Sequence, residues 1–342
     1  MYLTQQSKLL FLITLSLWTV FLWPGRAEIQ SRTSLRRLYV ANEGSDSVSV
    51  IDPADLSLVA RVPTGVHPHN VSVDPQGRYF YVTVLFTKES DDLVQIFDVK
   101  TNALVTAVHV EHQPAHVVPD PTGKRLYVSS EFGNSVSIIP VPEFKKVETV
   151  KLKGRGPHGQ VITPDGRVLL VPNGRSGDVS VVDLVHRKLD LIKLPPGAKP
   201  VAMGADQDGK FAYVTDAGLN QVHKIDIAKK IVLASLSVGK RPMQVPVHPT
   251  RPALYIPCME SDAVYKVDLQ NWKVEKIIPV GKGAQGIAYA ADGKYAYVTL
   301  AGEKPDGRVA VIDTETDMVQ MTFPVEAAPN GIAVLFGKNQ GW

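Results

Sequence analysis

The stretch GIAYAADGKYAYVTLAGEKPDGRVAVIDTETDMVQMTFPVEAAPNGIAVLF, residues 286–336, holds one unit of an internal repeat and the start of the next. A short apolar segment leads into an Asp-Gly turn, and a segment rich in aromatic and β-branched residues follows. Two further segments complete the unit before GIAVLF repeats the pattern of GIAYA. Apolar and polar residues that alternate between turns are typical of β-strands, so each unit predicts four of them.

A proline recurs at the start of nearly every unit and gives the period of the repeat. These prolines are Pro68, Pro114, Pro157, Pro200, Pro242 and Pro329. Their spacings are 46, 43, 43 and 42 residues, and then 87 residues across a unit in which Ala284 replaces the proline. Four strands in a unit of this length are typical of a β-propeller blade, and seven such loops predict seven blades.

The two ends of the repeat predict a closed ring. The repeat begins on a second strand, RLYVAN (37–42), and ends on a lone first strand, NGIAVLF (330–336). The last strand is therefore expected to complete the sheet that the first three strands begin, which leaves the ring without an open edge. The sequence thus predicts an all-β, seven-bladed propeller with four antiparallel strands per blade, as a single domain over residues 37–336.

Residues 1–27 are predicted to be a signal peptide. Lys8 precedes an apolar run over 9–23, and the small residues Gly25 and Ala27 follow it. The run is shorter than the ~20 residues that span a bilayer, so cleavage after Ala27 is favoured over a permanent membrane anchor. We therefore expect a periplasmic or extracellular protein, with residues 28–36 as a linker and 337–342 as a tail.

The charge of the chain gives no reason to expect a nucleic-acid partner. The formal net charge is +3, and removal of Lys8 and Arg26 with the signal peptide leaves about +1. A single cysteine, Cys258, excludes an internal disulfide. Because it ends the apolar segment LYIPC, it is expected to be a buried side chain.

Several strands resemble those of the YVTN-repeat family. The segments that carry the resemblance are LYVAN (38–42), YVT (81–83), LYV (126–128), YVTD (213–216) and YVT (297–299). Members of that family are seven-bladed propellers of bacterial and archaeal envelopes, so the resemblance implies the same fold and location. The repeats are more distantly similar to the d1-haem propeller of cytochrome cd1 nitrite reductase and to the propeller of nitrous oxide reductase. The resemblance is specific for fold and says little about function.

The proline loops are the predicted ligand-binding region. The first strand of each propeller blade lines the central channel, so these loops are expected to converge on one mouth, a common place for ligand sites. The predicted ligand-binding residues are His69, His116, His158, Arg155, Lys199, Arg241, Met243, Gln244, Gln285 and Asn330. The basic residues favour an anionic small molecule, a cofactor or a protein partner at the mouth.

Three histidines on neighbouring blades are candidate metal ligands. Neutral imidazole is the commonest metal ligand, and three nitrogens at ~2.0–2.1 Å from one ion leave an open coordination position. However, His116 lies two residues after its proline, whereas His69 and His158 lie one residue after theirs. No carboxylate that would orient the rings is evident from the sequence. The alternative, in which the histidines bond the loop backbone around an aqueous channel, stays open.

Four carboxylates are expected on the same face, in the loops between second and third strands. They are Glu43, Glu131, Asp216 and Glu260. We interpret them as solvated turn residues that can pair with the basic side chains of the mouth.

Two functions remain open at this point. A non-enzymatic binding or scaffold protein of the envelope accounts for the near-neutral charge and for the missing catalytic motifs. The alternative is a d1-haem-type or metal-dependent protein of redox chemistry or cofactor maturation, with haem or a transition metal held by the channel histidines. The chain has no C-x-x-C-H motif for covalent haem. A calcium-dependent lactonase is disfavoured because the first strands carry almost no acidic residues.

Overall fold

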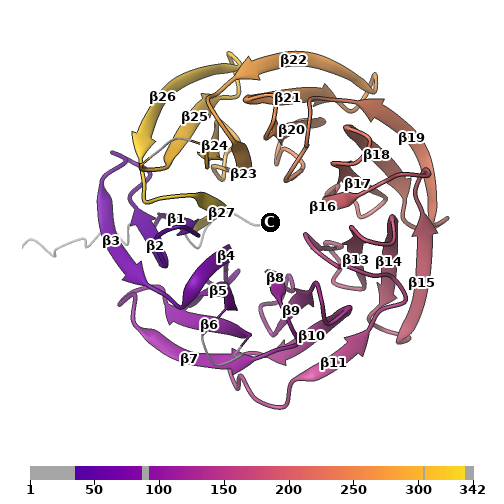
Figure 1. Cartoon of the computed structure of the whole chain (residues 1–342), viewed down its shortest axis with the longest axis horizontal. Helices are drawn as coiled ribbons and strands as arrows, with labels where there is room; N and C mark the ends of the chain where they lie inside the picture. Colours follow the sequence, from indigo (N-terminus) through magenta and orange to yellow (C-terminus); the bar gives the residue numbers. More distant parts are fainter. Residues whose placement is uncertain (1–34, 87–91, 303–304, 336–342) are drawn as a thin grey trace, which may run out of the picture. The chain divides into compact units, whose positions relative to one another are not determined.

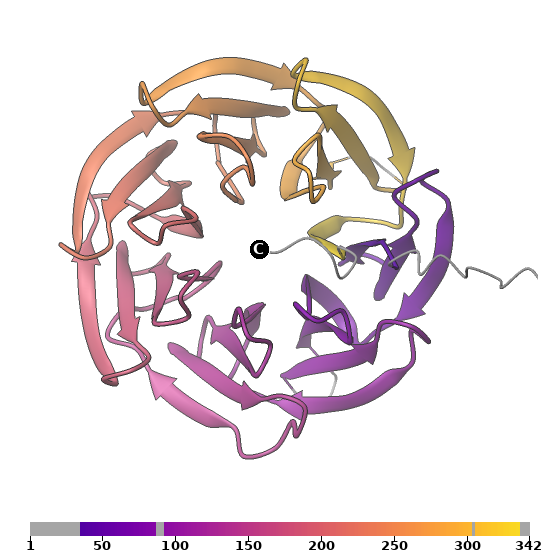
Figure 2. The same cartoon turned by 180° about the vertical axis from the view of Figure 1, so that it is seen from behind.

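The computed structural model describes residues 35–86, 92–302 and 305–335. The predicted signal peptide and C-terminal tail lie outside the described residues, as does most of the linker. The described residues form seven small antiparallel sheets arranged in a ring, with no helix among them (Figures 1 and 2). No segment in these ranges is therefore a helix that could cross a membrane.

The strands of each blade follow one another from the inner to the outer side of the ring (Figure 1). The first blade contains β27 (Pro329–Leu335), β1 (Arg37–Asn42), β2 (Ser47–Ile51) and β3 (Leu58–Pro63). The second contains β4 (Val66–Val73), β5 (Tyr79–Phe86), β6 (Leu93–Asp98) and β7 (Leu104–His109). The third contains β8 (Pro114–Pro119), β9 (Arg125–Ser130), β10 (Ser135–Pro140) and β11 (Glu148–Lys151).

The remaining four blades continue the same order around the ring. The fourth contains β12 (Val161–Ile162), β13 (Val168–Asn173), β14 (Asp178–Asp183) and β15 (Lys188–Lys193). The fifth contains β16 (Pro200–Ala205), β17 (Phe211–Asp216), β18 (Gln221–Asp226) and β19 (Ile231–Ser237). The sixth contains β20 (Ala253–Cys258), β21 (Ala263–Asp268) and β22 (Lys273–Pro279). The seventh contains β23 (Ala284–Tyr289), β24 (Tyr295–Leu300), β25 (Arg308–Asp313) and β26 (Met318–Pro324).

The ring closes through the first blade, as the sequence predicts. β27 pairs antiparallel with β1, with Leu38 opposite Val334 and Val40 opposite Ile332. The strand nearest the C-terminus thus supplies the inner strand of a blade whose other strands come from the start of the propeller.

Two blades depart from regular four-stranded pairing at their inner edge. β12 has only two residues, and in the sixth blade the inner segment makes isolated bridges instead of a strand. In these blades the second strand carries a proline, Pro172 or Pro257, one residue before its C-terminal end. Proline has no N–H to donate to a ladder, so the inner segment pairs less regularly there.

A hydroxyl on the second strand ties each of four blades to the next. Thr83 Oγ1 accepts the backbone N–H of Asn70 at 3.0 Å and donates to the carbonyl of Ala115, in the next blade, at 2.9 Å. The same two contacts are made in the third, fifth and seventh blades by Ser129, Thr215 and Thr299. The hydroxyl residue of the repeated strand motif therefore fastens neighbouring blades at the inner edge of the ring.

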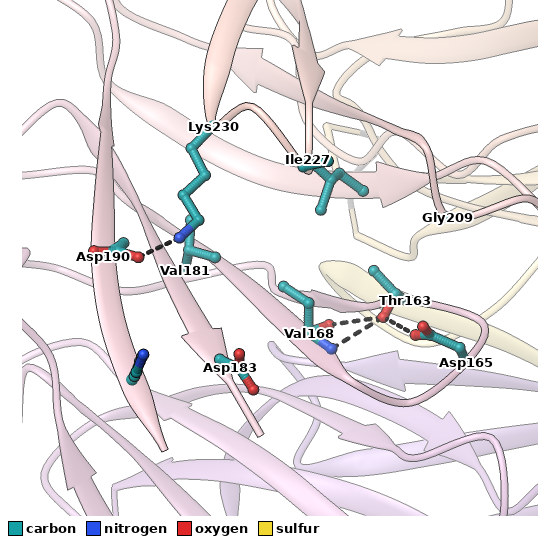
Figure 3. Close-up of a pocket in the computed structure, with 11 residues that line it drawn as sticks. Thr163, Asp165, Val168, Val181, Asp183, Asp190, Gly209, Ile227 and Lys230 are labelled. Carbon is teal, nitrogen blue, oxygen red and sulfur yellow. Dashed lines mark hydrogen bonds and ion pairs between the residues drawn. The ribbon is translucent and has the colours of Figure 1, made fainter. Parts of the chain in front are cut away.

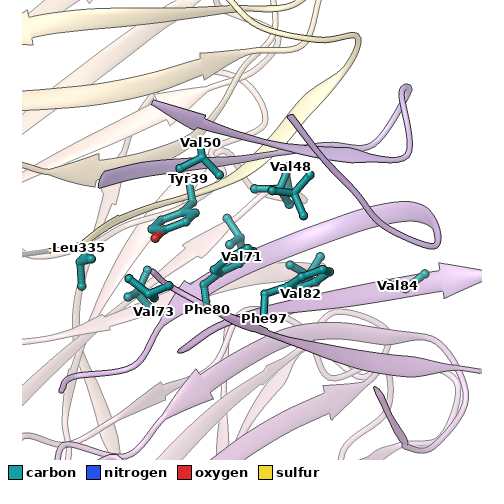
Figure 4. Close-up of a cluster of buried hydrophobic side chains, with 13 residues drawn as sticks. Tyr39, Val48, Val50, Val71, Val73, Phe80, Val82, Val84, Phe97 and Leu335 are labelled. Atoms are coloured by element: carbon teal, nitrogen blue, oxygen red, sulfur yellow. The ribbon is translucent and has the colours of Figure 1, made fainter. Parts of the chain in front are cut away.

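Apolar side chains fill the spaces between neighbouring blades. Figure 4 shows the cluster between the first and second blades, where Tyr39 and Phe97 flank Phe80. The ring centroids of Tyr39 and Phe80 are 4.6 Å apart, and those of Phe80 and Phe97 are 4.8 Å apart. Cys258 is fully buried in another such cluster, as predicted, and burial raises the pKa of its thiol to about 12.

Candidate functional site

The structure brings His69, His116 and His158 together at the inner edges of three successive blades. His69 lies on β4, His116 on β8, and His158 just before β12. The Nε2 atoms of His69 and His158 are 3.2 Å apart. The ring centroid of His116 is 4.9 Å from that of His158 and 5.7 Å from that of His69. One nitrogen from each ring can be chosen so that all three lie within 4.8 Å of one another.

His116 joins the other two rings although it lies one position later in its repeat, because His69 and His116 both lie in a β-bulge at the start of their inner strand. The register of β8 against β9 shifts between Pro114 and Val117. Two residues, the second of which is His116, therefore oppose Ser129 alone. A bulge changes the direction of the side chains that it carries, so the offset counted along the sequence does not separate the rings in space.

Hydrogen bonds fix the position and the tautomer of His158. Its backbone N–H donates to the carbonyl of Pro172 at 3.0 Å, and its own carbonyl accepts the hydroxyl of Ser129 at 2.6 Å. Its Nδ1 lies 3.1 Å from the carbonyl of Val201. A carbonyl only accepts, so Nδ1 carries the proton and Nε2 is left with a free lone pair. That Nε2 atom faces His69.

Asn330 and Glu43 orient the ring of His69. The amide Nδ2 of Asn330 donates to Nδ1 of His69 at 2.9 Å and to Oε2 of Glu43 at 2.9 Å. The other carboxylate oxygen, Oε1, lies 3.8 Å from the same Nδ1. Sequence reasoning placed Asn330 at the mouth but missed Glu43 as a partner of the histidines. A carboxylate behind one ring is therefore present, because the turn after β1 is held against the segment before β27 by the hydrogen bond from Glu43 N–H to the carbonyl of Ala328 at 3.0 Å.

Burial keeps two of the three histidines neutral. Burial lowers the pKa of His116 well below its ordinary value, and the His158 and His69 rings lower it further. Burial together with the His69 ring lowers the pKa of His158 to about 3. Burial alone would raise the pKa of Glu43, but the neighbouring His69 ring and the hydrogen bond from Asn330 outweigh it, and the net pKa is lowered. At neutral pH the site thus combines neutral imidazoles with one carboxylate.

The predicted amide and thioether residues lie at the inner edge of the sixth and seventh blades and do not join the histidine cluster. Met243, Gln244 and Gln285 are half-buried. The side-chain carbonyl of Gln244 accepts the backbone N–H of Ile287 in the next blade at 3.1 Å. Gln244 therefore links two neighbouring blades. Asn70 does the same where its side-chain carbonyl accepts the N–H of Val117 in the third blade.

The predicted basic residues are exposed. Arg241 pairs with Glu260 at 3.6 Å, and both side chains are about half exposed. Arg155 and Lys199 are exposed, and within the described ranges neither side chain has an ionic partner. Arg155 and Lys199 are thus available to bind an anion, whereas Arg241 is already paired with Glu260.

One of the four carboxylates was interpreted wrongly. Asp216 is not a solvated turn residue, because its side chain is fully buried and lies 3.0 Å from Nε2 of His223. It also accepts three backbone N–H groups of its own turn and the preceding loop. The short turn after β17 needs these acceptors, which explains why the carboxylate points inward. Glu131 does pair with a basic residue, Arg175, at 3.1 Å.

Hollows also lie between neighbouring blades. Figure 3 shows one of about 290 Å³ between the fourth and fifth blades. Some of its polar groups already bond one another, since Lys230 pairs with Asp190 and the Thr163 hydroxyl bonds Asp165. A second hollow of about 610 Å³ lies between the third and fourth blades.

A family comparison identifies the kind of propeller. The family described as YNCE-like β-propeller matches residues 48–253, more than half of the 342-residue chain. The chain belongs to this family. Antigen Lp49 of Leptospira interrogans serogroup Icterohaemorrhagiae serovar copenhageni (strain Fiocruz L1-130) is 26% identical to this YNCE-like propeller over 223 residues, which cover 59% of the chain and 48% of Lp49. The chain thus spans about half the length of that relative.

Solved structures share the fold of this YNCE-like propeller. The dihydro-haem d1 dehydrogenase NirN in complex with DHE has a TM-score of 0.64 at 14% identity and covers 86% of this chain and 74% of its own. A putative 6-phosphogluconolactonase from Bacteroides fragilis NCTC 9343 has a TM-score of 0.72 at 17% identity. The match covers 90% of this chain and 99% of the lactonase chain. At these identities the similarity shows the fold. Together with the family match it confirms the resemblance to repeat propellers that the strand motifs predicted.

Proposed function

We propose that this protein is an exported binding protein that takes a small ligand at the mouth of its central channel. The observation that supports the proposal is the convergence of three imidazoles from three successive blades, with a hydrogen-bonded amide and carboxylate behind one of them. A rigid ring that holds side chains from different blades around one point is suited to surround a ligand. Two of the imidazoles are neutral at physiological pH, so they can donate lone pairs or hydrogen bonds.

The test is to export the full chain to a bacterial periplasm, purify it without a histidine tag and analyse it by native mass spectrometry. We expect the wild-type protein to carry a bound species that the His69→Ala/His158→Ala double variant lacks. His186→Ala is the matched control, because His186 is exposed and pairs with Asp183 away from the cluster. A double variant that retains the bound species, or a wild-type protein that carries none, would contradict the proposal.

A second candidate is a cofactor-dependent protein of the haem d1 kind, which the two available cations favour. Arg155 lies three residues before His158 and Lys199 lies just before the next proline loop. Exposed cations beside an imidazole suit the carboxylates of a tetrapyrrole. An absorption spectrum of the exported protein separates the two candidates, since a Soret band that disappears in His158→Ala would favour the tetrapyrrole. A spectrum without such a band would remove this candidate.

A further inference from the structure

We propose that the ligand of the three-histidine site is a divalent transition-metal ion of the zinc class, bound by His69, His116 and His158 with one coordination position left open. This inference rests on the proposed function, because it names the chemical class of the ligand. It follows from three features of the site: the separation of the nitrogens, the groups that hold the rings, and the chemistry of the donors.

The separation of the nitrogens suits a tetrahedral ion. Two ligands at ~2.0–2.1 Å from a tetrahedral ion are about 3.3 Å from each other. The Nε2 atoms of His69 and His158 are 3.2 Å apart, so this pair already has the spacing that chelation requires. One nitrogen of His116 lies within 4.8 Å of one nitrogen on each of the other two rings, so His116 has to move closer before all three can bind one ion. A rotation of one side chain supplies such a movement.

The groups behind the rings are those that orient metal-bound imidazoles. A ligating histidine donates its other N–H to a carbonyl or a carboxylate. His158 already donates Nδ1–H to the carbonyl of Val201, which leaves Nε2 free to ligate. For His69 the proton has to be on Nδ1 and not on Nε2, a change of tautomer that exchange with solvent supplies. The carboxylate of Glu43, whose Oε1 lies 3.8 Å from that Nδ1, is the acceptor that the Nδ1–H then needs, and Asn330 holds its other oxygen.

The donors select the class of ion. Three imidazoles and no ligating carboxylate suit zinc, cobalt(II), nickel(II) or copper(II), whereas magnesium and calcium prefer oxygen ligands. Three neutral ligands leave the two positive charges of the ion largely uncompensated, and Glu43 supplies only one nearby negative charge. The open position is therefore suited to an anion from the channel, and the exposed Arg155 can attract one toward the mouth.

Cobalt(II) chloride and zinc chloride are the probes for this proposal, added to the full chain after chelation and without a histidine tag. We expect one equivalent of cobalt(II) to give the intense visible absorption of a tetrahedral site. Sodium azide should change that spectrum by entering the open position. Zinc should displace the cobalt and bind with one-to-one stoichiometry in calorimetry.

Variants assign the ligands. His69→Ala, His116→Ala and His158→Ala should each weaken zinc binding by more than about 100-fold, because loss of an outer hydrogen-bond partner alone costs 10–100-fold. His186→Ala should leave it unchanged. If a variant does not fold, the wild-type cobalt spectrum and its response to azide still decide the question.

The possible results test the metal site and the proposed function separately. Wild-type protein that binds neither ion, or zinc binding that survives His116→Ala, overturns the metal site. If an organic species is then found on the exported protein and is lost from the double variant, the proposed function stands without the metal. If neither a metal nor an organic species depends on the histidines, both proposals are wrong.

Discussion

The amide of Asn330 donates to Nδ1 of His69 at 2.9 Å, although 261 residues separate them in the sequence. Asn330 lies on β27, the strand that closes the ring, and His69 lies on the inner strand of the next blade. Closure of the propeller and orientation of the first histidine therefore depend on the same strand. The site is complete only when the last strand of the ring is in place.

Loss of this amide should weaken binding without unfolding the ring. Asn330→Ala is expected to lower zinc affinity by about 10–100-fold, because the amide holds the Glu43 carboxylate that accepts Nδ1–H of a metal-bound His69. Gln285→Ala is the matched control, because Gln285 occupies the same place in the preceding loop and is half-buried. Calorimetric titration of both variants checks the prediction. Equal affinity in the two variants would show that the amide does not orient His69.

The hydroxyl contacts between blades should stabilise the ring. Thr83→Val keeps the shape of the side chain but leaves the N–H of Asn70 and the carbonyl of Ala115 without their partner. We expect the free energy of unfolding to fall by about 1–3 kcal/mol, the cost of unsatisfied buried groups. Urea unfolding measures it, with the exposed Thr149→Val as the control. If the free energy of unfolding falls no further in Thr83→Val than in the control, the hydroxyl contact does not stabilise the ring.

Cys258 should be inert in the folded protein. Its side chain is fully buried, and burial raises the pKa of the thiol to about 12, so the reactive thiolate is scarce at mildly alkaline pH. We expect no reaction with a disulfide reagent or iodoacetamide until denaturant is added, and one reacting thiol per chain afterwards. Rapid labelling of the native protein would mean that the sixth blade opens readily.

Asp216 should make stability fall in acid. Burial alone would raise the pKa of Asp216, but hydrogen bonds from His223 and from backbone N–H groups outweigh it and lower the pKa. A carboxyl group with a depressed folded pKa stabilises the protein above its unfolded pKa of about 3.9, and this contribution disappears as the pH falls through the folded pKa. Asp216→Asn should therefore cost about 1–3 kcal/mol at neutral pH.

The difference between wild type and Asp216→Asn should begin to shrink as the pH falls below about 4, where the carboxyl of the unfolded chain takes up its proton. Both side chains are neutral in the folded protein only below the lowered folded pKa of Asp216, and there the contribution of its charge is lost. Urea unfolding at neutral and acidic pH measures this difference. A difference that is the same at both values would assign the effect of the variant to packing instead of charge.

The fold was predictable because its determinants are local and repeated. The turn in DGKYAYVTL and its counterparts, with the period of the proline loops, indicated the blades, and the unmatched strand at NGIAVLF indicated closure. The irregular inner edges were not predicted, although their cause is visible in the sequence. Pro172 and Pro257 stand where Thr83 and its equivalents stand in four other blades, and they interrupt the ladder there.

The site was predictable in its histidines and not in its geometry. The repeat placed His69, His116 and His158 in neighbouring loops. The bulge that carries both His69 and His116 depends on how two strands pair, which sequence spacing does not reveal. Glu43 and Asp216 occur in similar loops, yet one reaches across to Asn330 and the other is buried against His223. Such differences in side-chain direction arise from contacts between segments far apart in the sequence.

Anomalous diffraction from crystals of the full chain, soaked with zinc and measured at the zinc edge, tests the central claim most directly. The account predicts one strong peak within coordination distance of a ring nitrogen of His69, His116 and His158. A peak that touches fewer than three of these rings, or zinc bound only at surface histidines such as His186, would contradict it.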